Sequence, residues 1–124
     1  MKKLNKDIGN YCENIASTYL SDNKYTILDR NFRTRTGELD IICIKNDILI
    51  VVEVKGRYYD NYGLPCECVN KCKQKSIINC AKFYITANNF FNYLVRFDVV
   101  EVFLNNINSN DYKINHIKDA FRLN

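Results

Sequence analysis

The fold is decided by the stretch between residues 37 and 55, where two runs of mostly apolar residues flank a short polar turn. The first run is Gly37-Glu38-Leu39-Asp40-Ile41-Ile42-Cys43-Ile44, the turn is Lys45-Asn46-Asp47, and the second run is Ile48-Leu49-Ile50-Val51-Val52-Glu53-Val54-Lys55. Two β-branched runs around a short turn predict a β-hairpin. The second run is apolar on both faces, so we expect a central strand covered from both sides.

The elements around this hairpin follow from the periodicity of apolar residues. Helical spacing predicts one helix over residues 7–21 and another over residues 67–87, whose buried stripe includes Cys72, Ile77 and Tyr84. Alternating or β-branched runs predict further strands over residues 25–33, 96–103 and 112–118, with loops at 33–37 and 56–65. The order α-β-β-β-α-β-β predicts an α/β fold with a mixed central sheet flanked by helices.

The composition is that of an ordinary globular protein. With 124 residues, 47% of them hydrophobic and 26% charged, the chain is not collagen-like, wholly disordered or a coiled coil. No linker, repeat or low-complexity segment divides it, so we expect one domain over residues 1–124. The residues after Met1 are polar and no long apolar run occurs, so we expect no secretion signal, no membrane span and a cytoplasmic protein with reduced cysteines.

The net charge of +4 permits a nucleic-acid partner without demanding one. Its distribution is more informative. Between Lys24 and Lys82 there are 11 Lys and Arg against 7 Asp and Glu, so this segment carries the whole surplus.

Two acidic residues interrupt the apolar runs of the predicted hairpin. Acids are depleted in strands and seldom buried without a partner, yet Asp40 and Glu53 lie within the two most apolar segments. The period of two places Lys55 on the same face as Glu53, and the hairpin brings Asp40 alongside. Two neighbouring carboxylates repel unless a hard cation lies between them, and Mg²⁺ prefers such oxygens together with phosphate oxygens. The pattern therefore favours metal-assisted hydrolysis of a phosphodiester, in which Lys55 orients water or stabilises negative charge.

A structural explanation stands beside this one. Asp40 with Lys55, or Glu53 with Lys55, could form an ion pair at a strand end, and for any single pair that is the more ordinary explanation. The combination of both acids and the lysine favours chemistry.

Basic residues flank this pattern. Arg33, Arg35, Arg57 and Lys73 are candidates for contacts with nucleic-acid phosphates, and a solvated surface is the alternative. Glu13 falls about 20° beyond the apolar arc of the first helix, so its carboxylate can reach the edge of whatever that helix covers.

Zinc and histidine chemistry are disfavoured. The spacing of Cys66, Cys68 and Cys72 is not that of common zinc sites, and no fourth ligand is evident. His116, the one histidine, is expected on the surface of a strand.

Six sequence motifs together resemble the YraN family of small bacterial proteins, over nearly the whole chain. They are Gly9-x3-Glu13-x2-Ala16, Arg30-Asn31-Phe32-Arg33, Gly37-Glu38-Leu39-Asp40-Ile41-Ile42, Val52-Glu53-Val54-Lys55-x-Arg57, Gly63-x-Pro65-x-Glu67-x-Val69-x3-Lys73 and Arg96-Phe97-Asp98-Val99-Val100. The Asp, Glu-x-Lys pattern also resembles the PD-(D/E)XK superfamily of restriction-endonuclease-like and Holliday-junction-resolvase-like nucleases. Cys12 stands where relatives usually carry Gly, and we expect it to alter packing rather than chemistry.

The resemblance implies a restriction-endonuclease-like core and a Mg²⁺- or Mn²⁺-dependent endonuclease acting on DNA, with branched or flapped DNA as a candidate substrate. By the same resemblance, Asp40, Glu53 and the Val54 carbonyl match the metal ligands. Lys55 matches the motif lysine, and Glu13 matches the first-helix glutamate that often completes the site. A homodimer is compatible with the likeness to resolvases.

Two other functions remain open because one fold hosts many activities. The chain could bind nucleic acid without cutting it, or it could act on nucleic acid only as a subunit with a partner.

Overall fold

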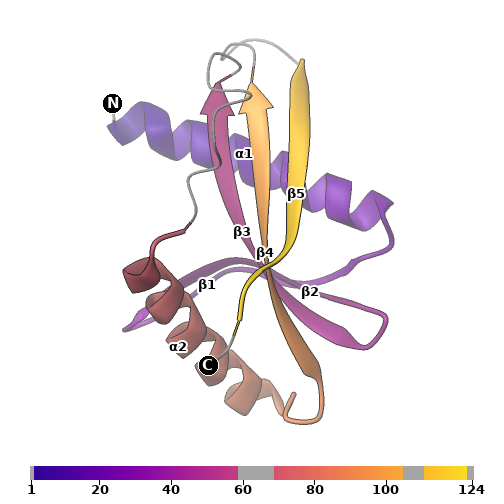
Figure 1. Cartoon of the computed structure of the whole chain (residues 1–124). Coiled ribbons are helices and arrows are strands. Elements are labelled where there is room, and N and C mark those ends of the chain that lie inside the picture. Colours follow the sequence, from indigo (N-terminus) through magenta and orange to yellow (C-terminus); the bar gives the residue numbers. More distant parts are fainter. Residues whose placement is uncertain (1, 59–68, 105–110, 123–124) are drawn as a thin grey trace.

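The computed structural model describes residues 2–58, 69–104 and 111–122, with side chains from residue 7 onward. Its elements follow in the order α1 (Lys2–Asp22), β1 (Thr26–Thr34), β2 (Gly37–Lys45), β3 (Ile48–Tyr58), α2 (Lys71–Asn88), β4 (Leu94–Leu104) and β5 (Tyr112–Phe121). The predicted order of elements and the α/β class are therefore confirmed (Figure 1).

One mixed sheet with the order β1-β2-β3-β4-β5 organises the molecule. The predicted hairpin is present, with Lys45 paired to Ile48 and with Asn46 and Asp47 in the left-handed conformation. Strands β3 and β4 are parallel, while the other neighbouring strands pair antiparallel. A parallel pair needs a crossover connection, and α2 lies in the segment that supplies it.

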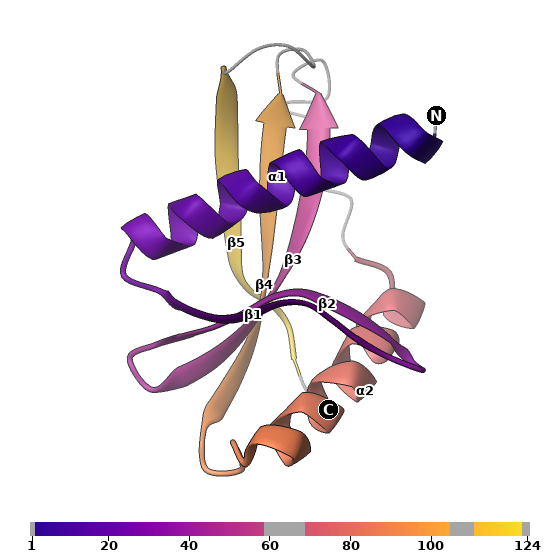
Figure 2. The same ribbon diagram turned by 180° about the vertical axis from the view of Figure 1, so that it is seen from behind.

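Each helix covers one face of the sheet. On one face Cys12, Ala16 and Leu20 of α1 pack against sheet residues that include Ile50 and Val52. On the other face α2 packs against a second set, which includes Leu49, Val51 and Phe97. Figure 2 views the molecule from the opposite side, and there α1 lies in front of β3, β4 and β5 and crosses them. The prediction that β3 is covered from both sides is confirmed. Each fully buried Leu or Ile side chain contributes about 1.5–3 kcal/mol to the free energy of folding, relative to an exposed one.

Helix α2 begins later than the sequence predicts. The Asn70 side chain accepts a hydrogen bond from the Lys73 N–H, and this N-cap starts the helix at Lys71. The prediction that Cys72 is buried is wrong, because Cys72 is exposed. At about 100° per residue it lies about 140° around the helix from buried Ile77. Cys66 and Cys68, the other two cysteines considered for zinc, lie outside the described residues.

Close packing of α1 explains part of the sequence around β3. This strand runs on through Gly56 to Tyr58, where the sequence suggested a loop, because it continues to pair with β4. A Cβ atom on Gly56 would lie 2.8 Å from the Cys12 Sγ. Cys12 is fully buried, in agreement with the expected role in packing.

A buried polar network joins β4, β5 and α1, and it overturns the expectation for His116. The His116 side chain is 5% exposed, its Nε2 lies 2.8 Å from Asp98 Oδ2, and its Nδ1 lies 2.9 Å from the Tyr19 hydroxyl. Arg96 donates two hydrogen bonds to Asp98, which is fully buried. Strand periodicity could not reveal this burial, because it depends on α1 covering that face of β5.

Within the described part of the chain, no helix combines the length and apolar character that crossing a bilayer requires.

The first prediction concerns the contact between β2 and α2. Gly37 has φ of 155°, and a Cβ atom there would clash with the Ser76 Oγ, which itself donates a hydrogen bond to the Thr36 carbonyl. Gly37→Ala should therefore lower the free energy of unfolding by about 1–3 kcal/mol, measured by urea denaturation.

Gly9→Ala is the matched control, because a Cβ on Gly9 in α1 meets nothing within 4 Å. It should be neutral or stabilising by up to about 1 kcal/mol. Equal stability of the two variants would contradict the proposed contact.

Candidate active site

The candidate site lies where β2 leaves β3. The two strands pair from Lys45 opposite Ile48 to Ile41 opposite Val52, and beyond this point β2 stays paired with β1 instead. Figure 1 shows β1 and β2 running together away from β3. The Asp40 side chain bridges the gap, since its Oδ2 accepts a hydrogen bond from the Val54 N–H at 2.8 Å. A carboxylate thus takes the place of a backbone acceptor of the sheet.

Glu53 faces Asp40 from the side of the sheet that α2 covers. It is 6% exposed, and its carboxyl group lies close enough to that of Asp40 for each to affect the pKa of the other. Burial, followed by the charge of Asp40, raises the pKa of Glu53 to about 8. Burial is also the main cause that raises the pKa of Asp40, against the lowering effect of the Val54 N–H. At neutral pH the pair therefore holds one proton in place of a second negative charge.

Two lysines lie beside this acid pair. The Nζ of Lys73, from the first turn of α2, lies 3.7 Å from the Glu53 Oε2. Lys55 is half-buried two residues after Glu53 on the same face of β3, and its charge also lowers the pKa of Glu53. The predicted neighbourhood of Asp40, Glu53 and Lys55 is thus present, and α2 adds a second ammonium group.

Glu13 approaches Asp40 from the opposite face of the sheet, on α1. Burial and then the charge of Asp40 raise the pKa of Glu13, and the neighbouring Asn31 side chain lowers it. Its Oε1 is buried with no hydrogen-bond partner among the described residues, and the closest cation, Arg30, has its Nη2 3.8 Å away. Glu13 therefore stands at the margin of the site with an unsatisfied acceptor.

The oxygen atoms around Asp40 suit a hard divalent cation. In a β-strand the N–H and C=O of one residue point to the same side, so the Val54 carbonyl shares the direction of the N–H that binds Asp40. Among the described residues no three His, Cys, Asp or Glu side chains form a ready metal cluster. The donor set is instead one carbonyl and two neighbouring carboxyl groups that together hold one proton at neutral pH, and a cation in place of that proton would relieve their repulsion.

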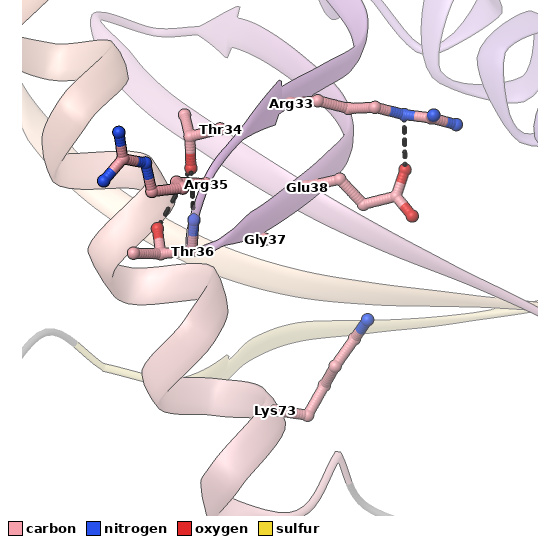
Figure 3. Close-up of a pocket in the computed structure, with 7 residues that line it drawn as sticks. All are labelled: Arg33, Thr34, Arg35, Thr36, Gly37, Glu38 and Lys73. Carbon is pink, nitrogen blue, oxygen red and sulfur yellow. Dashed lines mark hydrogen bonds and ion pairs between the residues drawn. The ribbon is translucent and has the colours of Figure 1, made fainter.

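Three of the four predicted phosphate-binding residues lie together. Arg33, Arg35 and Lys73 line a cavity of about 410 Å³ beside the site (Figure 3). Arg57 lies elsewhere: its Nε donates a hydrogen bond of 2.9 Å to Glu101, and its side chain is 18% exposed.

Two residues near the acids, Arg30 and Asn31, were assigned no role from the sequence. Arg30 and Asn31 contact Glu13 from β1, and the charge of Glu38 raises the pKa of both Asp40 and Glu13. Arg30 and Asn31 belong to a motif noted above. That motif is the signal in the sequence, whereas the pairing of Arg30 with Ile41, one residue from Asp40, is known only from the structure.

The second prediction concerns stability and pH in the absence of metal. The folded-state pKa of Glu53, about 8, lies above its ordinary value of 4.5, so the folded protein binds more protons than the unfolded chain between these values. Stability should therefore fall as pH rises from about 5 to 8. Glu53→Gln should remove roughly 2–4 kcal/mol of this dependence, measured by urea denaturation in EDTA. Asp47→Asn, in the exposed turn, should keep it; a wild-type profile in Glu53→Gln would contradict the assignment.

Comparison with known proteins places the chain in a family. The model of the "Uncharacterised protein family UPF0102" matches residues 12–102. A UPF0102 protein of Clostridium beijerinckii is 60% identical over 124 residues, which cover all of both chains. One of Clostridium botulinum, strain Alaska E43, is 59% identical over 98% of this chain and 99% of its own. One of Clostridium acetobutylicum is 48% identical over 99% of this chain and 100% of its own. The chain therefore belongs to the UPF0102 family, which is the YraN family that its motifs indicate.

Proposed function

We propose that this protein is a metal-dependent nuclease that hydrolyses phosphodiester bonds in DNA. The single observation that carries the proposal is the pair of neighbouring carboxyl groups at the point where β2 leaves β3, formed by buried Glu53 and by Asp40, which the Val54 N–H holds in place. Burying two carboxylates beside each other is costly, and a purely structural role does not need both. A cation site that receives a phosphate oxygen accounts for the pair and for the neighbouring lysines.

The residues that would hold Mg²⁺ or Mn²⁺ are Asp40, Glu53 and the Val54 carbonyl. When bound, such an ion lowers the pKa of water and offsets charge on the phosphate. The hydrogen bond from the Val54 N–H keeps the Asp40 carboxylate oriented in the gap between the strands.

The remaining polar groups have separate tasks. The ammonium groups of Lys55 and Lys73 stabilise the negative charge that develops on the phosphate oxygens. The Glu13 Oε1, which has no hydrogen-bond partner among the described residues, accepts a hydrogen bond from a water molecule and so orients it. The buried walls from α1 and α2 strengthen these interactions by limiting the access of bulk water.

The direct test is cleavage of labelled single-stranded, duplex, flapped and branched DNA with Mg²⁺ or Mn²⁺. Asp40→Asn and Glu53→Gln should each reduce the rate more than roughly 100-fold, since even residues that only support metal ligands contribute about 10–100-fold. Asp47→Asn changes the same functional group in the exposed β2–β3 turn and should retain the wild-type rate.

Cleavage that persists in Asp40→Asn would show that another site or a contaminant is responsible. Salt-sensitive DNA binding without cleavage, under every metal and on every substrate, would favour the non-catalytic binding module instead.

Metal binding should depend on pH because the proton held by the acid pair must leave before the ion enters. Calorimetry should detect Mn²⁺ binding to the wild type, with affinity rising up to about tenfold per pH unit below pH 8 and levelling off above the pKa of Glu53, about 8. Glu53→Gln has no proton to release there and should bind weakly at every pH. A pH-independent affinity in the wild type would mean that Mn²⁺ does not use this pair.

A further inference from the structure

We infer that the cavity at the β1–β2 turn binds a backbone phosphate of the substrate strand, next to the phosphate that is cut. This inference rests on the proposed function for the position of the scissile phosphate. The cavity is lined by Arg33, Thr34, Arg35, Thr36, Gly37, Glu38 and Lys73.

The charges in this cavity favour an anion. Three cationic side chains line it against one carboxylate. Arg33 is engaged, since its Nε lies 3.2 Å from the Glu38 Oε2. Arg35 is exposed, and no carboxylate among the described residues pairs with it. Figure 3 shows Arg33 and Arg35 extending to opposite sides of the turn. Arg35 is thus the cation of the turn that is available to a ligand.

The turn that carries Arg35 is held in place by hydrogen bonds. The Thr34 Oγ1 lies 3.0 Å from the Thr36 Oγ1 and accepts from the Thr36 N–H at 3.2 Å. Ser76 of α2 donates to the Thr36 carbonyl. Because the turn is tied to α2, a ligand does not have to order it, which lowers the entropic cost of binding.

The cavity adjoins the acid pair directly. Lys73 lines the cavity, and its Nζ lies 3.7 Å from the Glu53 Oε2. Glu38, which also lines the cavity, precedes Asp40 by two residues on β2. Successive phosphates of a strand in duplex DNA advance by about 3.4 Å along the helix axis. Since Lys73 belongs to both places, a strand whose scissile phosphate lies at Asp40 and Glu53 can reach this cavity with a neighbouring phosphate.

The groups around the cavity contact phosphates rather than read bases. Its seven lining residues offer guanidinium, ammonium and hydroxyl groups, with one carboxylate that is paired to Arg33, and no aromatic ring for stacking. The cavity therefore positions a strand of any sequence, and the expected ligand is the sugar–phosphate backbone.

The test measures binding of fluorescein-labelled DNA by anisotropy in the Asp40→Asn background, where cleavage is silenced. Adding Arg35→Ala should weaken binding about 5–10-fold and reduce the slope of log affinity against log salt by about one. Arg35→Lys should retain most of that slope. Lys82→Ala is the matched control, since it removes an exposed cation further along α2, outside this cavity, and should change affinity less than about twofold.

The outcomes separate this inference from the proposed function. Equal effects of Arg35→Ala and Lys82→Ala would overturn the phosphate site, even if wild-type protein cuts DNA. A selective loss of binding in Arg35→Ala would support the site, even if wild-type protein cuts nothing and the nuclease proposal fails.

Discussion

The site depends on the hydrogen bond between the Val54 N–H and the Asp40 carboxylate. Where two strands separate, backbone groups lose their partners, and an unpaired buried N–H costs free energy comparable to a lost hydrogen bond. Asp40 satisfies that donor with a side chain, so β2 can follow β1 while β3 continues beside β4. The gap brings a carboxylate to Glu53 in a place that regular pairing would have filled with backbone.

Burying these acids lowers the stability of the protein, and the packing of the rest of the fold offsets that loss. Burial raises the pKa of both Asp40 and Glu53, and Lys73 approaches Glu53 because the Asn70 cap starts α2 beside the gap. Two apolar clusters, one on each face of the sheet, hold α1 and α2 against the strands. The stability that these clusters provide allows Asp40 and Glu53 to lie side by side where β2 leaves β3, despite their mutual repulsion.

The features predicted correctly were those with a strong local signal. The apolar runs around Asn46 and Asp47 predicted the hairpin, and the spacing of Cys12, Ala16 and Leu20 predicted the buried face of α1. Cys72 and His116 were assigned to the wrong environments, because Cys72 lies about 140° around α2 from buried Ile77 and because α1 covers His116 from a distant part of the chain. Likewise, the sequence around Arg35 and Arg57 does not show that Arg35 lines the cavity while Arg57 forms an ion pair with Glu101.

By itself, the sequence determined the order of elements, the central position of β3 and the family, since alternation, helical spacing and motifs are properties of the chain alone. It also identified Asp40, Glu53 and Lys55 as the unusual charges of an apolar hairpin. Only the tertiary structure decided that Asp40 caps the Val54 N–H, that Lys73 joins Glu53 and that Arg33 and Arg35 share a cavity with it. The reason is that each of these contacts joins different elements, and their distances depend on packing across the sheet rather than on spacing along the chain.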